Sequence, residues 1–152
     1  MNLRKATSSD LEIVLHHRRE IFREMGYSTD PIVAALADSQ ARLFFAKAFE
    51  EGHYLGWLVE DPEGWIAAGS GVILVEYHPS PTNPHLRRPW VVNMYTEAAY
   101  RRRGLARILM EAMIEWTRAQ GYTNLFLHAS EEGRPLYQGL GFAVSNEMRL
   151  KL

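Results

Sequence analysis

Residues 101–106 combine positive charge with small side chains directly before the most regular helical pattern of the chain. They read Arg101-Arg102-Arg103-Gly104-Leu105-Ala106. The start of a helix has unpaired backbone N–H groups and partial positive charge, so it attracts anions. Gly104 lets a phosphate approach the backbone, and the arginines add charge-assisted hydrogen bonds. These residues predict a phosphate-binding loop, with a solvated basic turn before an ordinary helix as the alternative.

A strand and a helix must position this loop. Residues 89–96 are rich in aromatic and β-branched side chains, which favours a strand. Residues 105–120 carry apolar side chains at helical spacing, and Gly121 follows where a helix would end. This order of strand, loop and helix would place the start of the helix next to a ligand that binds beside the strand.

A second motif, Leu136-Tyr137-Gln138-Gly139-Leu140-Gly141-Phe142, follows further along the chain. The first segment resembles the [Q/R]-x-x-G-x-[G/A] pyrophosphate loop of the GCN5-related N-acetyltransferase (GNAT) superfamily. The second is similar to that family's L-Y-x-x-x-G-F segment. The resemblance implies one α/β (α+β) domain over residues 1–152, with a mixed, mostly antiparallel sheet, a splayed central strand pair and helices on both faces.

The same resemblance implies acetyl-CoA as co-substrate and assigns residues to it. The strand would bulge and pair its backbone at Met94, Tyr95 and Thr96 with the pantetheine arm. An N–H group near Met94 would stabilise the thioester oxyanion. Arg101 to Ala106 (Arg101, Arg102, Arg103, Gly104, Leu105 and Ala106) would hold the pyrophosphate. Ser130 stands where many relatives carry an asparagine that contacts pantetheine.

The resemblance also implies direct transfer to an amine, with Tyr137 as the general acid. A tyrosine pKa of about 10 keeps the hydroxyl protonated at neutral pH, as a proton donor requires. An amine arrives mostly protonated, so a base or a water relay is needed. Glu76 and Glu97 are the candidate bases, and Asn93 could orient a water. His128 is a further candidate relay, although a half-buried structural role suits it equally.

The rest of the chain alternates helical and strand-like patterns. A capping box is expected at residues 9–12, and Gly69 and Gly71 suggest a bulge or a close backbone approach. The expected strands are 3–6, 54–60, 65–77, 124–129 and 144–152. The expected helices are 11–26, 31–51 and 133–140, the second with Asp30 as N-cap. Residues 61–64 form the turn of a hairpin, and 78–85 form a loop.

Composition excludes several classes of protein. The 152 residues suit one domain, and the net charge of −1 disfavours a nucleic-acid partner or an anionic membrane surface. The chain has no cysteine, which excludes disulfides, thiolate metal sites and a cysteine nucleophile. No histidine motif typical of a metal site occurs, so no metal is expected. No signal peptide or membrane-spanning run is visible, so the cytoplasm is the expected location.

These observations predict an acetyl-CoA-dependent N-acetyltransferase that acts on a primary amine, with a small molecule as the expected acceptor. The alternatives are a non-catalytic CoA-binding sensor and an acetyltransferase for a protein or tRNA-linked amine. A tRNA would require Arg87 and Arg88 to cluster with residues 101–103. The acceptor site would use the first two helices, their connection at 26–30 and the loop 78–88, with Glu24 meeting a cationic amine. A homodimer is also expected, because many relatives of that family form one.

Overall fold

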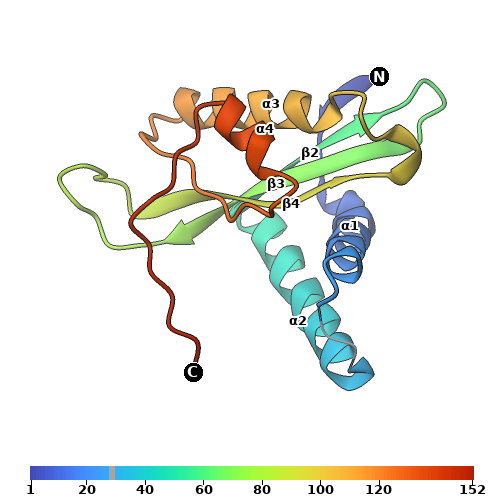
Figure 1. Ribbon diagram of the computed structural model, residues 1–152, viewed down its shortest axis with the longest axis horizontal. Helices are drawn as coiled ribbons and strands as arrows, with labels where there is room; N and C mark the ends of the chain where they lie inside the picture. Colours follow the sequence, from blue (N-terminus) through green and yellow to red (C-terminus); the bar gives the residue numbers. More distant parts are fainter. Residues whose placement is uncertain (28–29) are drawn as a thin grey trace.

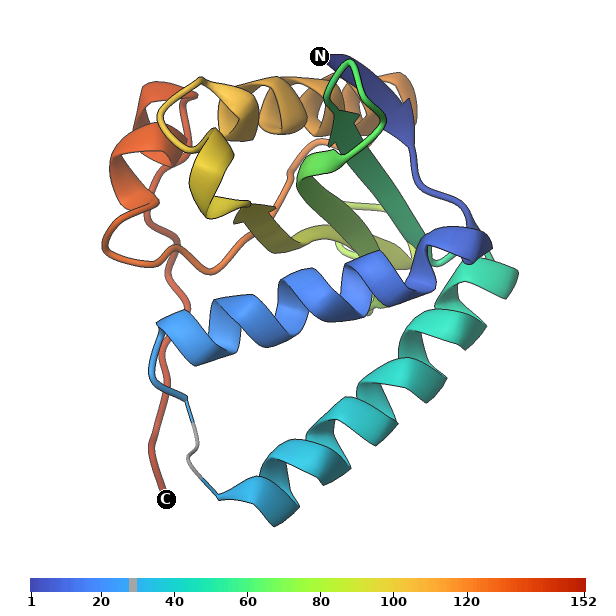
Figure 2. The same cartoon turned by 90° about the vertical axis from the view of Figure 1, so that its right-hand side faces the viewer.

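Four antiparallel strands form a sheet that separates two pairs of helices (Figures 1 and 2). The computed structural model describes residues 1–27 and 30–152. Its strands lie in the order β1-β2-β3-β4, with bounds β1 Asn2–Lys5, β2 Tyr54–Glu60, β3 Ile66–Glu76 and β4 Arg87–Thr96. The helices are α1 Leu11–Glu24, α2 Pro31–Glu50, α3 Leu105–Ala119 and α4 Arg134–Gly139. Helices α1 and α2 cover one face and α3 and α4 the other, as expected.

The start of α2 is capped as the sequence predicts, whereas the start of α1 differs. The Asp30 carboxylate accepts hydrogen bonds from the first N–H groups of α2, and Pro31 follows it. The capping box at residues 9–12 is wrong. A 3-10 turn, Ser8–Asp10, precedes α1, and the Asp10 carboxylate accepts a 2.8 Å hydrogen bond from the Thr7 N–H group. Glu12 instead forms an ion pair with Arg42 of α2.

The β2–β3 hairpin depends on a close approach at Gly71. A Cβ atom there would lie only 2.3 Å from a ring carbon of Tyr54, so a side chain would displace that buried ring. The ring occupies this space and packs edge-on against Phe45 and Phe49 of α2. The hairpin turn is also as predicted, because the Asp61 carboxylate accepts hydrogen bonds from the N–H groups two and four residues later. Glycine at position 71 therefore lets α2 pack closely on the sheet.

Each face of the sheet has its own hydrophobic core. The core under α3 joins strand residues to Leu105, Leu109, Met110 and Met113, on the buried side of the helix that the apolar spacing predicted. The core on the other face is formed by Val14, Leu15, Ala41, Phe45, Ala48 and Tyr54. Among the described residues, no helix has the length and apolar character needed to cross a membrane.

The last two predicted strands are wrong as continuous strands. Residues 124–129 pair with β4 through an isolated parallel bridge between Trp90 and Phe126 and not through a continuous ladder. Residues 143–152 form no secondary structure and are exposed throughout. Their alternating pattern suits a strand, but they make no backbone hydrogen bonds to another segment among residues 1–27 and 30–152. Segment 124–129 therefore gains no outer neighbour from this part of the chain.

An ion-pair network fixes β1 against the turn that begins α1. Arg4 donates two hydrogen bonds to the Asp10 carboxylate, at 2.8 and 2.9 Å, and a third to Glu60 of β2. These bonds from Arg4, aided by the Thr7 N–H group, lower the pKa of Asp10 to about 2. Because this pKa lies below that of an unfolded aspartate, the ionised carboxylate stabilises the fold above about pH 4. This contribution is lost as the pH falls toward 2.

We predict that Asp10→Asn lowers the free energy of unfolding by about 2 kcal/mol at pH 7 and by about half as much at pH 3. Urea denaturation at both pH values measures the difference. Asp38→Asn removes a more exposed carboxylate, which pairs with Arg19 at 3.2 Å, and should cost under about 0.5 kcal/mol. An equal loss of unfolding free energy in Asp10→Asn at both pH values would contradict the stabilising role of the ionised carboxylate.

Candidate functional site

Strand β4 bulges near its centre, as the resemblance implied and as Gly69 and Gly71 suggested. Gly69 faces Tyr95 and Gly71 faces Val92, so one residue of β3 opposes two residues of β4. The two residues are 93 and 94, and the first has φ = 55°. Asparagine tolerates this left-handed conformation better than most residues. The bulge bends β4 and removes Met94 from the ladder with β3.

The bend leaves one edge of β4 open beyond its midpoint. The Val91 N–H group donates to the Phe126 carbonyl at 2.8 Å, and the Phe126 N–H group donates to the Pro89 carbonyl at 3.0 Å. Within residues 1–27 and 30–152, no further backbone hydrogen bond joins β4 to segment 124–129. The two segments therefore part beyond Val91. An open strand edge of this kind can pair with an extended ligand.

A buried amide lies at the same bulge. The Nδ2 atom of Asn93 is shielded from solvent and has no hydrogen-bond partner among the described residues. Such a group costs free energy unless an acceptor reaches it. The bulge therefore offers an unused donor beside the open edge.

The start of α3 forms a cradle of N–H groups. Arg102 and Gly104 have φ angles of 62° and 78°, which turn successive N–H groups toward one side. Among the described residues, the N–H groups of residues 102–106 have no hydrogen-bond acceptor. A Cβ atom on Gly104 would have no neighbour within 4 Å, so the space beside the cradle is open. This arrangement fits a phosphate or pyrophosphate group.

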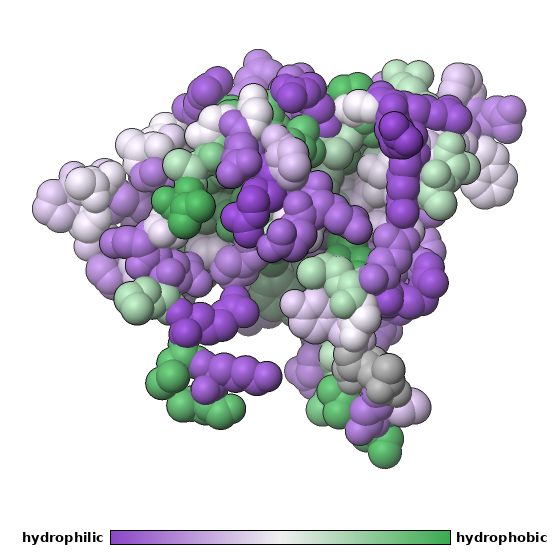
Figure 3. Space-filling view, in the orientation of Figure 1, coloured by the Kyte–Doolittle hydropathy of each residue, from purple (hydrophilic) through white to green (hydrophobic). Residues whose placement is uncertain are grey.

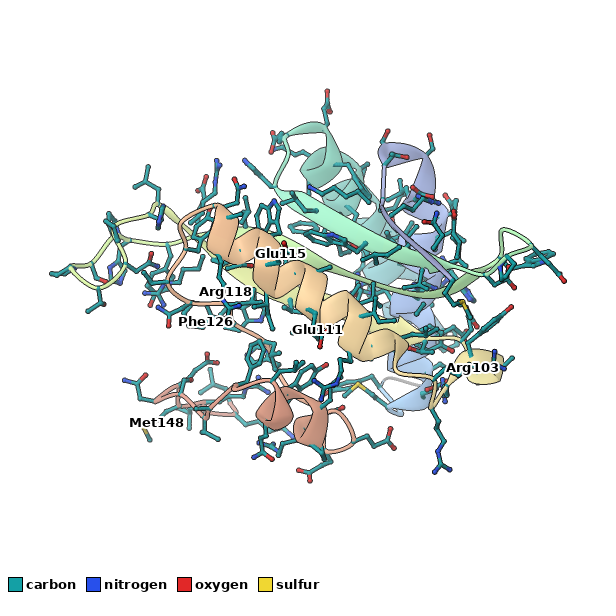
Figure 4. All side chains as sticks on the ribbon, turned by 90° about the horizontal axis from the view of Figure 1, so that it is seen from above. Arg103, Glu111, Glu115, Arg118, Phe126 and Met148 are labelled. Carbon is teal, nitrogen blue, oxygen red and sulfur yellow. The ribbon has the colours of Figure 1, made fainter. Side chains whose placement is uncertain are left out.

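The arginine side chains of the loop mainly brace it. Arg101 donates to the Thr96 carbonyl at 3.0 Å and forms a 2.6 Å ion pair with Glu24 of α1. Arg103, which Figure 4 labels where the chain enters α3, donates to the Ala99 carbonyl at 3.0 Å. Arg102 has no such contact among the described residues. The backbone therefore offers more free donors to an anion than Arg101 or Arg103 does.

Glu24 is engaged within the protein. Its carboxylate accepts hydrogen bonds from Arg101 and, at 3.2 Å, from the Tyr95 hydroxyl. Both contacts use the Oε1 atom, so the expectation that Glu24 meets a cationic amine stays a prediction, with Arg101 as a cationic partner that is already present. These contacts tie the last turn of α1 to the end of β4 and to the cradle loop.

A histidine pair on α1 meets Glu97 just after β4. His16 Nε2 lies 3.0 Å and His17 Nε2 lies 3.7 Å from the Glu97 carboxylate. Burial, aided by the nearby charge of His16, lowers the pKa of His17 to about 4, so the His17 ring is neutral at pH 7. No motif in the sequence predicts this pair. Helical spacing could have indicated that His17 is buried, because it lies three residues after Val14 on the buried side of α1.

Tyr137 lies on α4 in the core under α3. Its ring packs against Phe142 with 6.0 Å between ring centroids, and burial alone raises the pKa of its hydroxyl, which has no hydrogen-bond partner among the described residues. Ser130 lies next to it, since a Cβ atom on Gly133 would be within 3.2 Å of both the Ser130 Oγ atom and the Tyr137 ring. The Ser130 Oγ atom accepts a hydrogen bond from the Gly133 N–H group, which leaves its own hydrogen free.

Other expected residues lie elsewhere. Glu76 is exposed and lies opposite Arg87 at the far end of β3, roughly 20 Å along the strand from the bulge. Glu97 therefore lies at the same end of the sheet as the cradle, whereas Glu76 lies at the opposite end. Arg87 and Arg88 begin β4, whereas residues 101–103 follow its end, so the five arginines do not form one basic patch. His128 is exposed and contacts Glu147 at 3.4 Å.

Part of the expected acceptor side lies at the end of α1. Phe22 packs edge-on against Tyr27, and both Tyr27 and Met25 are largely exposed at the end of α1. They form an apolar surface next to Glu24. Within the connection 26–30, residues 28–29 lie outside the described part of the chain.

A bulged strand with one open edge, followed by an anion-binding helix start, defines the class of α/β domain that the two sequence motifs implied. The sequence model described as the Acetyltransferase (GNAT) family matches residues 11–142. Because this match covers most of the 152 residues, the chain belongs to that family.

Solved structures agree with this membership. A GCN5-related N-acetyltransferase from Ralstonia eutropha is 31% identical, with a TM-score of 0.89 over 99% of this chain and 97% of that one. A predicted acetyltransferase from Clostridium acetobutylicum, solved with acetyl-CoA, is 25% identical, with a TM-score of 0.86 over 99% and 94%. Glucosamine-6-phosphate N-acetyltransferase from Arabidopsis thaliana shares the fold at 16% identity, with a TM-score of 0.68 over 99% and 97%. No curated protein matches the chain.

Proposed function

We propose that this chain transfers an acetyl group from acetyl-CoA directly to the primary amine of a small molecule. One observation carries the proposal: the open edge of β4 runs into the N–H cradle at residues 102–106. An extended arm that ends in a pyrophosphate would use both features together. The related protein from Clostridium acetobutylicum, solved with acetyl-CoA, supports the choice of donor.

The donor-binding residues divide between backbone and side chains. The backbone of residues 94–96 would pair with the pantetheine arm, and the N–H groups of residues 102–106 would hold the pyrophosphate. Arg101 and Arg103 would brace the loop through the contacts described above, while Arg102 would add a mobile positive charge. The Ser130 hydroxyl would donate to the pantetheine arm. The amide of Asn93, which has no hydrogen-bond partner among the described residues, would add a donor near the thioester.

The reaction moves one acyl group and two protons. Acetyl-CoA supplies the activated acetyl group. The amine nitrogen bonds to the carbonyl carbon, and the N–H group near Met94 stabilises the negative charge that develops on the carbonyl oxygen. The carbon–sulfur bond then breaks, and Tyr137 protonates the departing thiolate. The raised pKa of Tyr137 keeps its hydroxyl protonated until that step.

Glu97 is the better of the two candidate bases. It follows β4 directly and contacts His16, whose ring is partly exposed and can pass a proton to water. Glu76 lies at the other end of the sheet, where it cannot reach an amine bound near the bulge. Glu97, acting through His16, would accept the proton that the amine loses.

A small-molecule acceptor fits the distribution of charge better than a tRNA does. Arg87 and Arg88 are separated from residues 101–103 by the length of β4, so they provide no broad basic surface. The exposed side chains of Met25 and Tyr27, which follow α1, suit a compact ligand with an apolar part. A sensor without turnover would not require a largely buried tyrosine whose hydroxyl has no partner among the described residues.

The donor assignment predicts that Gly104→Asp weakens acetyl-CoA binding about 100-fold, because a carboxylate at the cradle repels the pyrophosphate. Isothermal titration calorimetry measures the affinity. Gly121→Asp is the matched control, since Gly121 ends the same helix with nearly the same φ, 79° against 78°. It carries the same backbone strain but should bind normally. Equal binding by both variants, or none by the parent protein, would reject the proposal.

For the general acid, Tyr137→Phe should lower kcat at least about 100-fold while the affinity for acetyl-CoA stays within about twofold. Thiol release in the presence of a panel of amines measures the rate. Tyr122→Phe removes a hydroxyl remote from the bulge and should leave the rate unchanged. A Tyr137→Phe enzyme with the parent kcat would show that another group protonates the thiolate.

For the base, Glu97→Gln should lower kcat/KM for the amine about 100-fold at pH 7, with a smaller loss at higher pH. The loss shrinks because an amine that is already neutral needs no base. Glu76→Gln serves as the control and should keep the parent pH–rate profile. If Glu76→Gln produced the loss and Glu97→Gln did not, the assignment of the base would be reversed.

A further inference from the structure

Four aromatic side chains lie side by side on the sheet and belong to neither hydrophobic core. The Trp90 ring stacks on the Phe126 ring, with 5.4 Å between centroids and 17° between planes, and meets the His128 ring at 4.9 Å and 64°. The Arg88 guanidinium lies 3.4 Å from the centre of the Tyr77 ring and 5.4 Å from that of Phe126. We call Tyr77, Phe126, Trp90 and His128 the aromatic row.

The aromatic row lies on the side of the sheet that carries α1 and α2. Because side chains alternate along a strand, Arg88 and Trp90 share a face with Val92, which packs in the core formed with those helices. In Figure 1 the far end of the β3–β4 hairpin extends past α2, with no helix of the described chain beneath it. Figure 3 shows open space on this side, between the two helices and the C-terminal tail, residues 143–152. The row is half-buried or exposed, so a ligand can reach it.

Arg88 is held in place by aromatic contacts but has no anionic partner. Its Nε atom is shielded from solvent and has no hydrogen-bond partner among the described residues. Arg4 and Arg101 each pair with a carboxylate, whereas no carboxylate of the described chain lies within ion-pair distance of Arg88. A guanidinium stacked on a ring keeps its N–H donors in its own plane, where they match the two oxygens of a carboxylate. Arg88 therefore offers a preformed site for a carboxylate.

The charge changes sign along the aromatic row. Arg88 lies at the end remote from the bulge. His128 follows Phe126 toward the bulge, because this segment runs parallel to β4, and it holds the Glu147 carboxylate at 3.4 Å. A ligand with an ammonium group at one end and a carboxylate at the other would therefore bind with its amine toward the bulge.

We infer that the acceptor is a short peptide, whose N-terminal amine reaches the bulge, whose aromatic side chain packs on the aromatic row and whose C-terminal carboxylate binds Arg88. This inference rests on the proposed function, because it names the substrate class of the same reaction. Trp90 and Phe126 would select the aromatic side chain, and the Arg88 guanidinium would donate two parallel hydrogen bonds to the carboxylate.

The distance along β4 sets the length of the peptide. Six residues separate Arg88 from Met94, which is about 20 Å of strand at 3.3 Å per residue. An extended peptide spans about 3.3–3.6 Å per residue, so roughly four to six residues reach from the bulge to Arg88. The amine and the carboxylate of a single amino acid are too close together to reach both.

Isothermal titration calorimetry with a pentapeptide tests the carboxylate contact. The probe has phenylalanine as its third residue, alanine elsewhere and a free C-terminal carboxylate, and coenzyme A is present so that no transfer occurs. The parent protein should bind this peptide about 30-fold more tightly than the same peptide with a C-terminal amide. Arg88→Gln should reduce this ratio to within about twofold. Arg87→Gln is the matched control, because Arg87 lies on the opposite face of β4, and should keep the ratio.

Replacing Trp90 tests the aromatic contact. Trp90→Leu should weaken binding of the pentapeptide about fivefold, but should change binding of the all-alanine pentapeptide less than twofold. An unchanged affinity of each variant for acetyl-CoA verifies that it is folded. No binding of the pentapeptide by the parent protein, equal binding of acid and amide, or a ratio that survives Arg88→Gln would each overturn the inference.

Thiol release from acetyl-CoA with the same peptide separates this inference from the proposed function. Selective binding of the acid without thiol release would reject acetyl transfer to this peptide and keep Arg88 as its carboxylate site. Thiol release with other amines, combined with equal binding of acid and amide, would keep acetyl transfer and overturn the peptide assignment.

Discussion

The bulge in β4 is the feature on which the rest of the site depends. One extra residue bends the strand, and the bend has two results. It separates β4 from segment 124–129 beyond Val91, which opens an edge, and it leaves Met94 outside the ladder. Both results require Asn93 to hold a positive φ angle, so the local backbone strain and the open edge have one origin.

Helix α1 holds this region in place from the opposite face. Glu24 reaches Arg101 and Tyr95, and Glu97 reaches the histidine pair, so ionic contacts join α1 to the end of β4. The apolar residues of α1 pack in a core with α2 and with Tyr54, Ile73 and Val92 of three neighbouring strands. The ionic contacts link the loop before α3 to the helix that borders the expected acceptor side. A substitution in α1 that breaks them should therefore also destabilise the loop.

The sequence predicted the elements that local patterns specify. The limits of β2 and α3, the caps around α2 and the glycines near the bulge followed from side-chain types and spacing. The predictions failed where the structure of a segment depends on contacts with residues distant in the sequence. The pattern of residues 144–152 suits a strand, but a strand forms only where another edge pairs with it. Likewise, the local sequence around Glu24 does not predict Arg101 as its partner, because that contact depends on the packing of α1 against β4.

The cradle at the start of α3 is made of peptide groups, and this has an evolutionary consequence. Every residue except proline carries an N–H group, so most substitutions at positions 103, 105 and 106 preserve the cradle. The backbone constrains positions 102 and 104, because their φ angles are 62° and 78°. Such a design would let sequences drift far apart while the cradle of N–H groups persists.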